Sequence, residues 1–405
     1  MYKTIKDINL KNKKVILRVA FDVPLKKNEK EWIVVDDSRI KISIPTIKYL
    51  LKQDCKIILV SYLGRPNGKI VNDLRLKPVA KKLQEIFKNE KIIYLKDCIG
   101  NEIEQKVKKM KSNEIILLEN TRFYPEEEKN DLKFAKKIAN LGEIFINDAF
   151  AQSHRNYAST VGITKFLPSV MGLNFEEEIK ILTKVKTNAK RPLVIIIGGV
   201  KIDSKIDVIK NFLKQADWIL IGGVIGLFFL KELGYKVGKL PVSFLKNQNN
   251  GGIKKILAEL LPFVGEKIIL PVDGVIEKNI GDKKQLKEVD IAFLNSNVLL
   301  PISILDIGHQ TSELFSQYIQ KAKTIIWNGP MGLFEKDKFS QGTKKIAQIV
   351  ANSKAYSVIG GGDTEEAISK LRLNKKIGHV CVAGGAMLKF LANKKLPALE
   401  VLKKS

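Results

Sequence analysis

The chain has 405 residues, of which 45% are hydrophobic and 28% charged, as in a water-soluble globular protein long enough for two domains. The opening residues contain no apolar segment of the signal-peptide type, and the most apolar run, at 218–230, is shorter than the roughly 20 residues that span a bilayer. We therefore expect no membrane partner. Cys55, Cys98 and Cys381 lack paired spacing, which predicts a reducing, cytoplasmic compartment and no disulfide framework.

The net charge of +27 raises the alternative of a basic nucleic-acid-binding protein. However, the lysines are spread along the whole length, and arginine, which binds phosphate through a planar fork, is rare. This excess of lysine looks more like a coding bias than a binding face. We therefore expect no nucleic-acid partner.

In the first half, short apolar runs alternate with amphipathic helical patterns. We expect strands at 14–21, 56–63, 91–95, 114–119 and 144–148, with helices at 44–53, 76–87, 103–109 and 132–139 between them. Near-continuous apolar strands separated by such helices are typical of a parallel sheet covered on both faces.

The same alternation returns after a helical segment at 174–186. The expected strands are 193–197, 218–221, 267–270, 324–327, 355–359 and 377–382, and irregular polar connections are expected at 236–252 and 277–298. The fold class that follows is α/β, with two doubly wound, Rossmann-like parallel-sheet domains joined by a helix.

Ligands of open α/β sheets bind at the carboxyl ends of the strands, so the residues that follow each strand are candidate ligand contacts. In the first half, Arg39, Arg65, Arg122 and Arg155 fall at strand ends or in the adjoining loops. Arginine in these places suggests bidentate contacts with an anion, although four unrelated surface arginines remain the alternative.

In the second half, glycine follows strand after strand, at 198–199, 222–223, 360–362 and 384–385. Glycine lets backbone approach a ligand closely. After the triple glycine, Asp363 is expected to be the N-cap of a helix, with Glu366 at capping-box spacing. Unpaired N–H groups at such a helix start would bind phosphate, although an ordinary tight turn explains the same pattern.

Lys201 and Lys205 stand one helical turn apart, where they could reach a polyphosphate, and the chain has no Walker A sequence. The strand ends thus carry arginines in the first half of the chain and glycines in the second. We expect the two to face each other and to move a phosphoryl group between a small anion and a nucleotide.

Longer motifs extend this interpretation, and they occur in a fixed order. They are RVAFDVPL (18–25), DDSRI (36–40), SYLGRP (61–66), LLENTRFYPEEEKND (117–131), NDAFAQSHRNYASTVG (147–162), GGVKIDSKI (198–206), LPVDGV (270–275), LDIG (305–308), WNGPMGLFE (327–335), GGGDT (360–364) and GGA (384–386). On these motifs the chain resembles the phosphoglycerate kinase family along nearly its whole length.

The resemblance implies reversible transfer of the γ-phosphoryl group of ATP, bound with Mg²⁺, to the carboxylate of 3-phosphoglycerate. It also implies an N-terminal acid-binding domain at 1–172, a C-terminal nucleotide-binding domain at 173–390, and hinge bending between them. The tail at 391–405 would pack back on the first domain, and the protein would be a monomer.

Site residues follow from the same resemblance. The acid would be bound by Ala20, Phe21, Asp22, Arg39, Tyr62, Leu63, Gly64, Arg65, Arg122 and Arg155. The nucleotide would be bound by Gly199, Lys201, Lys205, Gly223, Asn328, Glu335, Gly361, Gly362, Asp363 and Thr364, with Asp363 holding the magnesium ion. The catalytic set would be Arg39, Lys201, Gly361 and Gly384.

Three acid-side positions depart from the family pattern. Ala20 stands where the family has aspartate, Asp22 where it has asparagine, and Tyr62 where it has histidine. An ionised Asp22 about 5 Å from a substrate anion would cost roughly 3 kcal/mol. We therefore expect weaker acid binding, or an Asp22 that stays protonated or turns outward, and a degraded or repurposed relative remains an alternative to the active kinase.

The nucleotide side departs as well. His309 replaces a proline, residues 299–302 replace another family motif, and Asp203 and Ser204 stand in reversed order.

Overall fold

The computed structural model describes residues 2–29, 31–112, 114–237, 251–280, 283–292 and 303–403. The chain forms two compact units, the first made of Met1–Ile181 and Lys395–Ser405 and the second of Leu182–Lys394. Residues 299–302 therefore lie outside the described part. Among the described residues, no helix is both long and apolar enough to cross a membrane.

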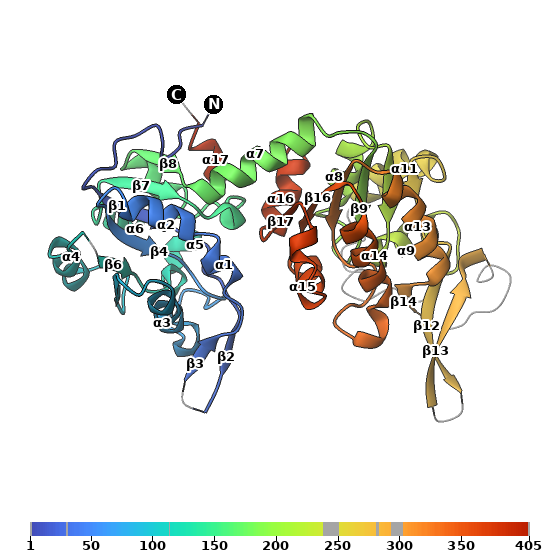
Figure 1. Cartoon of the computed structure of the whole chain (residues 1–405), viewed down its shortest axis with the longest axis horizontal. Coiled ribbons are helices and arrows are strands. Elements are labelled where there is room, and N and C mark those ends of the chain that lie inside the picture. Colours follow the sequence, from blue (N-terminus) through green and yellow to red (C-terminus); the bar gives the residue numbers. More distant parts are fainter. Residues whose placement is uncertain are drawn as a thin grey trace. The chain divides into compact units, whose positions relative to one another are not determined.

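The first unit is organised around a six-stranded parallel sheet with the order β5-β6-β4-β1-β7-β8 (Figure 1). Its strands are β1 (Lys14–Arg18), β4 (Lys56–Val60), β5 (Lys91–Tyr94), β6 (Glu114–Leu117), β7 (Ile144–Asn147) and β8 (Ser169–Met171). Its helices are α1 (Ser38–Lys41), α2 (Ile44–Leu51), α3 (Lys77–Ile86), α4 (Asn101–Lys108), α5 (Pro125–Glu128) and α6 (Leu132–Ala139), and a hairpin of β2 (Leu25–Lys27) and β3 (Trp32–Val34) is added.

Alternate residues of these strands enter two separate hydrophobic clusters. Val15 and Leu17 pack with residues of α2 and α3, whereas Ile16 packs with residues of α4 and α6. Because successive side chains of a strand point to opposite faces, a strand covered by helices on both sides must be apolar throughout. The parallel sheet predicted from the continuous apolar runs is confirmed.

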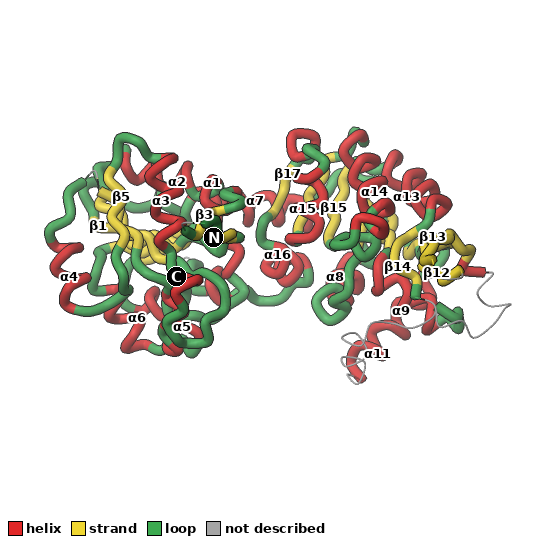
Figure 2. The backbone as a smooth tube through the Cα atoms, turned by 90° about the horizontal axis from the view of Figure 1, so that it is seen from below, coloured by secondary structure: helices red, strands yellow, loops and turns green. Residues whose placement is uncertain are grey.

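The second unit repeats this plan with a six-stranded parallel sheet in the order β11-β10-β9-β15-β16-β17. Its strands are β9 (Leu193–Ile197), β10 (Trp218–Ile221), β11 (Ile268–Ile269), β15 (Thr324–Asn328), β16 (Tyr356–Gly360) and β17 (His379–Cys381). Its helices are α8 (Ile206–Phe212), α9 (Gly223–Glu232), α11 (Gly251–Leu260), α13 (His309–Lys321), α14 (Gln341–Asn352), α15 (Gly362–Lys370) and α16 (Gly384–Leu391), seen from below in Figure 2. The fully buried Trp327 of β15 lies in the core beneath α13 and α14.

A small antiparallel sheet in the second unit was not expected from the sequence. It has the order β13-β12-β14 and consists of β12 (Asp273–Ile280), β13 (Lys283–Asp290) and β14 (Ile304–Ile307). The prediction of an irregular connection at 277–298 is therefore wrong for 277–280 and 283–290. The described residues of β13 are mostly exposed and polar, so this strand lacks the apolar run by which the other strands were recognised.

The end of the chain lies against the first unit, and α17 (Pro397–Glu400) belongs to it. The Ala398 N–H donates to the Ser153 carbonyl oxygen at 3.1 Å, and the Lys3 N–H donates to the Leu402 carbonyl oxygen at 3.3 Å. The two chain ends accordingly lie side by side in Figure 1. The long helix α7 (Leu173–Thr187) runs across the boundary between the units, whereas the sequence predicted the boundary just before this helix.

A buried carboxyl group from the end of β7 caps α7. Asp148 is fully buried, and its Oδ1 accepts hydrogen bonds from the N–H groups of Asn174 at 2.9 Å and Phe175 at 3.3 Å. Burial raises the pKa of Asp148 to about 7, although the hydrogen bonds from Thr46, the backbone and Ser43 oppose this shift. The group therefore keeps its proton in the folded chain at pH values where it loses it in the unfolded chain.

We expect this carboxyl group to make stability depend on pH. The folded pKa is raised, so the folded chain binds more protons than the unfolded chain between about pH 4 and pH 7, and stability falls as pH rises through this window. In Asp148→Asn this contribution is absent. Relative to the variant, the wild-type chain should lose roughly 3 kcal/mol of unfolding free energy between pH 4.5 and pH 7.5 in urea titrations. A difference that is constant with pH would contradict the assignment.

Candidate active site

The loops that follow β1 and β4 are joined by Asp22. Its Oδ1 accepts the Gly64 N–H at 2.9 Å, and its Oδ2 lies 3.8 Å from the terminal nitrogen Nη1 of Arg39. The same Arg39 nitrogen donates to the Asp22 carbonyl oxygen at 2.8 Å. Asp22 therefore points toward Arg39 and the Gly64 loop, so of the three alternatives expected for this residue the outward turn is excluded.

Arg122 lies in the turn after β6 and is held on several sides. Its terminal nitrogens donate to the Gly64 carbonyl oxygen at 2.6 Å and to the Tyr157 hydroxyl at 2.7 Å. Its Nε lies 3.0 Å from a carboxylate oxygen of Glu128. Only 6% of the residue is exposed, so its charge is largely removed from water and depends on these partners.

The other two expected arginines lie on adjoining loops and are exposed. Arg65 directly follows Gly64 in the chain, and Arg155 interacts electrostatically with Tyr157, the residue that Arg122 contacts. The structure thus brings the four predicted arginines to connected segments of the first unit, with Arg39 in α1 and the other three in turns and loops.

The remaining acid-side residues are buried. Phe21 and Leu63 belong to the hydrophobic core, which leaves only their backbone for contact with a ligand, and Ala20 and Tyr62 are also covered.

Sequence reasoning missed Arg18. It is the last residue of β1, it is fully buried, and its Nε donates to the Ser159 hydroxyl at 2.9 Å. Its guanidinium carbon lies 5.2 Å from the centre of the Tyr62 ring. The available signal was an arginine that ends a buried strand directly beside the expected ligand edge.

In the second unit, the loops at the carboxyl ends of neighbouring strands bond to one another. The Gly198 N–H donates to the Asn328 carbonyl oxygen at 3.0 Å, and the Gly199 N–H donates to the Pro330 carbonyl oxygen at 2.7 Å. The Asn328 side-chain amide donates to the Gly360 carbonyl oxygen at 2.6 Å. Because the backbone groups of one loop satisfy those of the next, the loops after β9, β15 and β16 form one connected surface.

Packing between these loops explains most of the strand-end glycines. A Cβ atom at Gly198 would lie 2.1 Å from the Pro330 carbonyl oxygen, at Gly223 it would lie 2.5 Å from the Gly199 nitrogen, and at Gly384 it would lie 2.6 Å from the Gly361 Cα. These glycines are therefore required whether or not a ligand is bound. A Cβ at Gly362 would meet nothing within 4 Å, which leaves the space above this residue open to a ligand.

Helix α15 begins two residues earlier than the sequence suggested. Its N-cap is Gly361, with a φ of 106°, and no side chain caps it, so the prediction of Asp363 as N-cap is wrong. Glycine alone adopts this φ without strain, so the chain turns there and Asp363 falls within the first helical turn, exposed. The Thr364 hydroxyl is buried and accepts the Gly329 N–H at 2.8 Å.

Lys205 is a buried cation beside this surface. It is 7% exposed, and its Nζ donates to the Gly198 carbonyl oxygen. Burial lowers the pKa of Lys205 to about 8, with Asp363 opposing the shift and Lys201 adding to it. The charges of Lys201 and Asp363 thus act directly on Lys205, whereas Glu335 lies exposed in the loop after β15.

The chain is similar to known proteins along nearly its whole length. The family model described as phosphoglycerate kinase matches residues 5–394. A phosphoglycerate kinase of Dictyoglomus turgidum is 44% identical, covering 98% of this chain and 97% of its own, and one of Thermosipho africanus is 45% identical, covering 98% and 96%. The solved phosphoglycerate kinase of Pyrococcus horikoshii superposes with a TM-score of 0.84 at 32% identity, covering 99% of this chain and 98% of its own.

The chain belongs to the phosphoglycerate kinase family. It is therefore an enzyme of the kinase class. Both the family resemblance of its motifs and the fold class predicted from its strands and helices are confirmed.

His309, which replaces a family proline, lies in a cluster with Asp273 and Glu288. Its Nδ1 pairs with a Glu288 carboxylate oxygen, and this contact raises the pKa of the imidazole. The buried Asp273 carboxylate accepts the N–H groups of Gln310 at 2.9 Å and Thr311 at 2.8 Å, at the start of α13. Helix capping and ion pairing thus account for the cluster.

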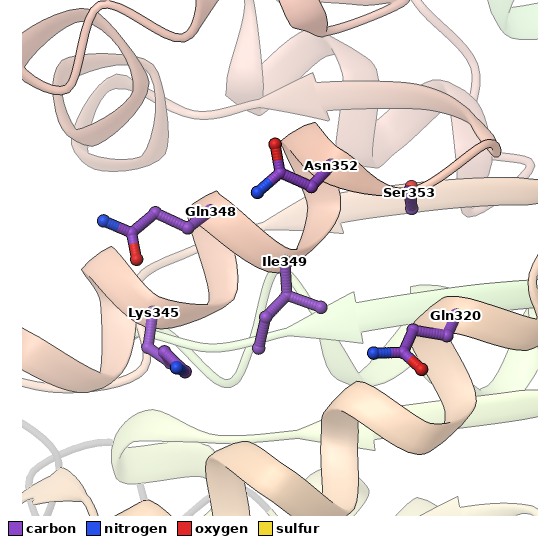
Figure 3. A pocket seen from close by; sticks show the side chains of 6 residues that line it. All are labelled: Gln320, Lys345, Gln348, Ile349, Asn352 and Ser353. Atoms are coloured by element: carbon purple, nitrogen blue, oxygen red, sulfur yellow. The ribbon is translucent and has the colours of Figure 1, made fainter.

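A surface cavity of about 230 Å³ lies between α13 and α14 (Figure 3). It is lined by Gln320, Lys345, Gln348, Ile349, Asn352 and Ser353. None of these residues belongs to the set that the family resemblance implies, so we assign the cavity no part in the kinase site.

Two alanine substitutions separate glycines required for packing from those that leave room for a ligand. We expect Gly198→Ala to destabilise the fold by roughly 2–4 kcal/mol, because its Cβ would overlap the Pro330 carbonyl group. Gly362→Ala, with open space around the Cβ, should stay within about 1 kcal/mol of the wild type. Thermal and urea unfolding of both variants measure this difference, and equal destabilisation would contradict it.

Proposed function

We propose that this chain is an active phosphoglycerate kinase that reversibly transfers the γ-phosphoryl group of MgATP to the carboxylate of 3-phosphoglycerate. The observation that carries the proposal is the connected set of arginines at the ligand edge of the first sheet. A small acid with a carboxylate and a phosphate group requires several cations, and guanidinium groups bind both anions bidentately.

On the acid side, Arg39 would bind the reacting carboxylate and the migrating phosphoryl group. Arg65, Arg122 and Arg155 would bind the phosphate that the acid already carries. Arg122 has five N–H donors, and its contacts to Gly64 and Tyr157 leave one N–H on each terminal nitrogen for an anion. Asp22 would orient Arg39 as well as lower the local positive charge.

On the nucleotide side, the start of α15 would bind the phosphates through its unpaired N–H groups, with the open side of Gly362 toward them. The exposed Asp363 would hold the magnesium ion that accompanies the nucleotide. Lys201 would stabilise charge on the transferred phosphoryl group, Lys205 the nucleotide phosphates, and Glu335 the ribose hydroxyls. Gly199, Gly223, Asn328, Gly361, Thr364 and Gly384 would shape the surface on which the nucleotide lies.

The competing interpretation, a relative that binds nucleotide without turnover, rests on Ala20, Asp22 and Tyr62. The inward-facing contacts of Asp22 and the retention of all four arginines favour the active kinase instead. We also propose that the enzyme acts as a cytoplasmic monomer.

Removal of Arg39 tests the proposed reaction. We expect Arg39→Ala to lower kcat by about 10³-fold or more, because one well-placed cation on a transferred phosphoryl group is worth this much. A coupled assay with 3-phosphoglycerate and MgATP measures the rate. The matched control is Arg191→Ala, which removes an exposed arginine paired with Asp217 at the opposite, amino end of β9. Absence of turnover in the wild-type chain would refute the proposal.

The buried ammonium group of Lys205 makes nucleotide binding depend on pH. Because its pKa is about 8 in the free chain, the group loses its proton as the pH rises from 7 to 9. We expect the affinity for MgADP to fall about tenfold over this range, since only the charged form attracts phosphate. Calorimetric titrations at pH 7, 8 and 9 measure the affinity.

The control for this experiment is Lys205→Met, which should bind MgADP weakly and without this dependence on pH. A wild-type affinity that is equal at pH 7 and pH 9 would show that the charge of Lys205 does not contribute to binding.

A further inference from the structure

The ring of Tyr62 lies beneath two guanidinium groups. The guanidinium carbon of Arg122 is 3.7 Å from the ring centre, and that of Arg18 is 5.2 Å from it. All three residues are almost completely buried. A cation over an aromatic face is attracted by the negative charge of that face, and the attraction grows when water is excluded.

The guanidinium group of Arg122 lies over two aromatic rings and is nearer to that of Tyr62, because its central carbon is 3.7 Å from the Tyr62 ring centre and 5.4 Å from that of Tyr157. Its terminal nitrogens donate to the Gly64 carbonyl oxygen and the Tyr157 hydroxyl, and a Glu128 carboxylate oxygen lies 3.0 Å from its Nε. The ring of Tyr62 also meets the ring of Tyr157 edge to face, with centres 6.3 Å apart, so it packs against the residue that bonds Arg122 as well.

The neighbouring charge of Arg18 gives this contact further importance. Arg18 is fully buried, and one of its terminal nitrogens has no hydrogen-bond partner among the described residues. Two buried guanidinium groups repel each other, and the aromatic ring that both contact offsets part of this repulsion. An aliphatic side chain at position 62 would fill the space without attracting either cation.

We propose that Tyr62 is a positioning residue, whose ring fixes the orientation in which Arg122 binds the phosphate of the acid. The family resemblance assigned Tyr62 a direct contact with the acid, whereas the geometry gives it a role through Arg122. The identity of the anion rests on the proposed function, but the contact between the ring and Arg122 does not.

Substitutions that keep or remove the ring test this role. Tyr62→Leu should raise KM for 3-phosphoglycerate about tenfold with a much smaller change in kcat and in KM for MgATP. Tyr62→Phe keeps the ring and should restore KM to within about threefold of the wild type. The matched control is Tyr49→Leu, which removes a tyrosine ring packed on the core of the same unit and should leave KM for the acid unchanged.

A double-mutant cycle separates action through Arg122 from independent action. In an Arg122→Ala background, Tyr62→Leu should have no further effect on KM for the acid. Additive effects would overturn the proposal, as would a Tyr62→Phe variant as defective as Tyr62→Leu, because the hydroxyl rather than the ring would then be the contact.

A spectroscopic measurement keeps the inference distinct from the proposed reaction. In NMR spectra of the ligand-free chain, the Nε–Hε signal of Arg122, assigned with Arg122→Lys, should be displaced by the ring current of Tyr62. Tyr62→Phe should retain this displacement, and Tyr62→Leu should abolish it. A signal that is the same in all three chains would overturn the inference even if the enzyme is active, whereas a displaced signal without turnover would refute only the proposed reaction.

Discussion

Charged groups held away from water at the carboxyl ends of two parallel sheets impose the main constraint on this structure. A buried guanidinium or ammonium group is stable only if fixed dipoles, carboxylates or aromatic faces replace the water that it has lost. Arg122 obtains this from a carbonyl oxygen, a hydroxyl, a carboxylate and a ring. Lys205 has fewer such partners, and its burial lowers the pKa of its ammonium group. The two units thus meet the same requirement differently, because Arg122 is held by fixed partners whereas the charge of Lys205 depends on pH.

The glycines of the second unit follow from a related constraint. Parallel strands bring successive loops to one edge of the sheet, where each loop must satisfy the backbone groups of its neighbours without water. The hydrogen bonds between Gly198, Gly199, Asn328 and Pro330 do so, and they require that the chains approach more closely than a Cβ atom permits. The glycines at this edge are therefore explained mainly by the close packing of the loops. Among the strand-end glycines discussed, only Gly362 has open space for a ligand beside it.

Sequence patterns predicted the regular parts of the fold well, because a strand covered on both faces must be apolar throughout. The strands β9 and β10 were predicted with the bounds that they have, as was helix α6. The hairpin of β12 and β13 was missed because the described residues of β13 are mostly exposed and polar and carry no apolar run. The N-cap of α15 was misplaced because the choice between Gly361 and Asp363 depends on a backbone angle that the residue types alone do not determine.

The site, too, could be predicted only in part from the sequence. The types and chain positions of the arginines indicated an anion-binding edge, but the direction of each side chain depends on contacts between distant loops. That Asp22 contacts Gly64 and Arg39, or that Arg18 shares a ring with Arg122, follows only from the register of β1 beside β4.

The division of the chain between its units has a consequence for biosynthesis. The second unit is one continuous stretch inserted into the first, whose last segment follows it in the sequence. During translation the second unit is therefore complete and able to fold before residues 395–403 leave the ribosome. The bridge between Tyr2 and Lys403 joins the two segments of the first unit, so it can form only after the whole second unit has been made.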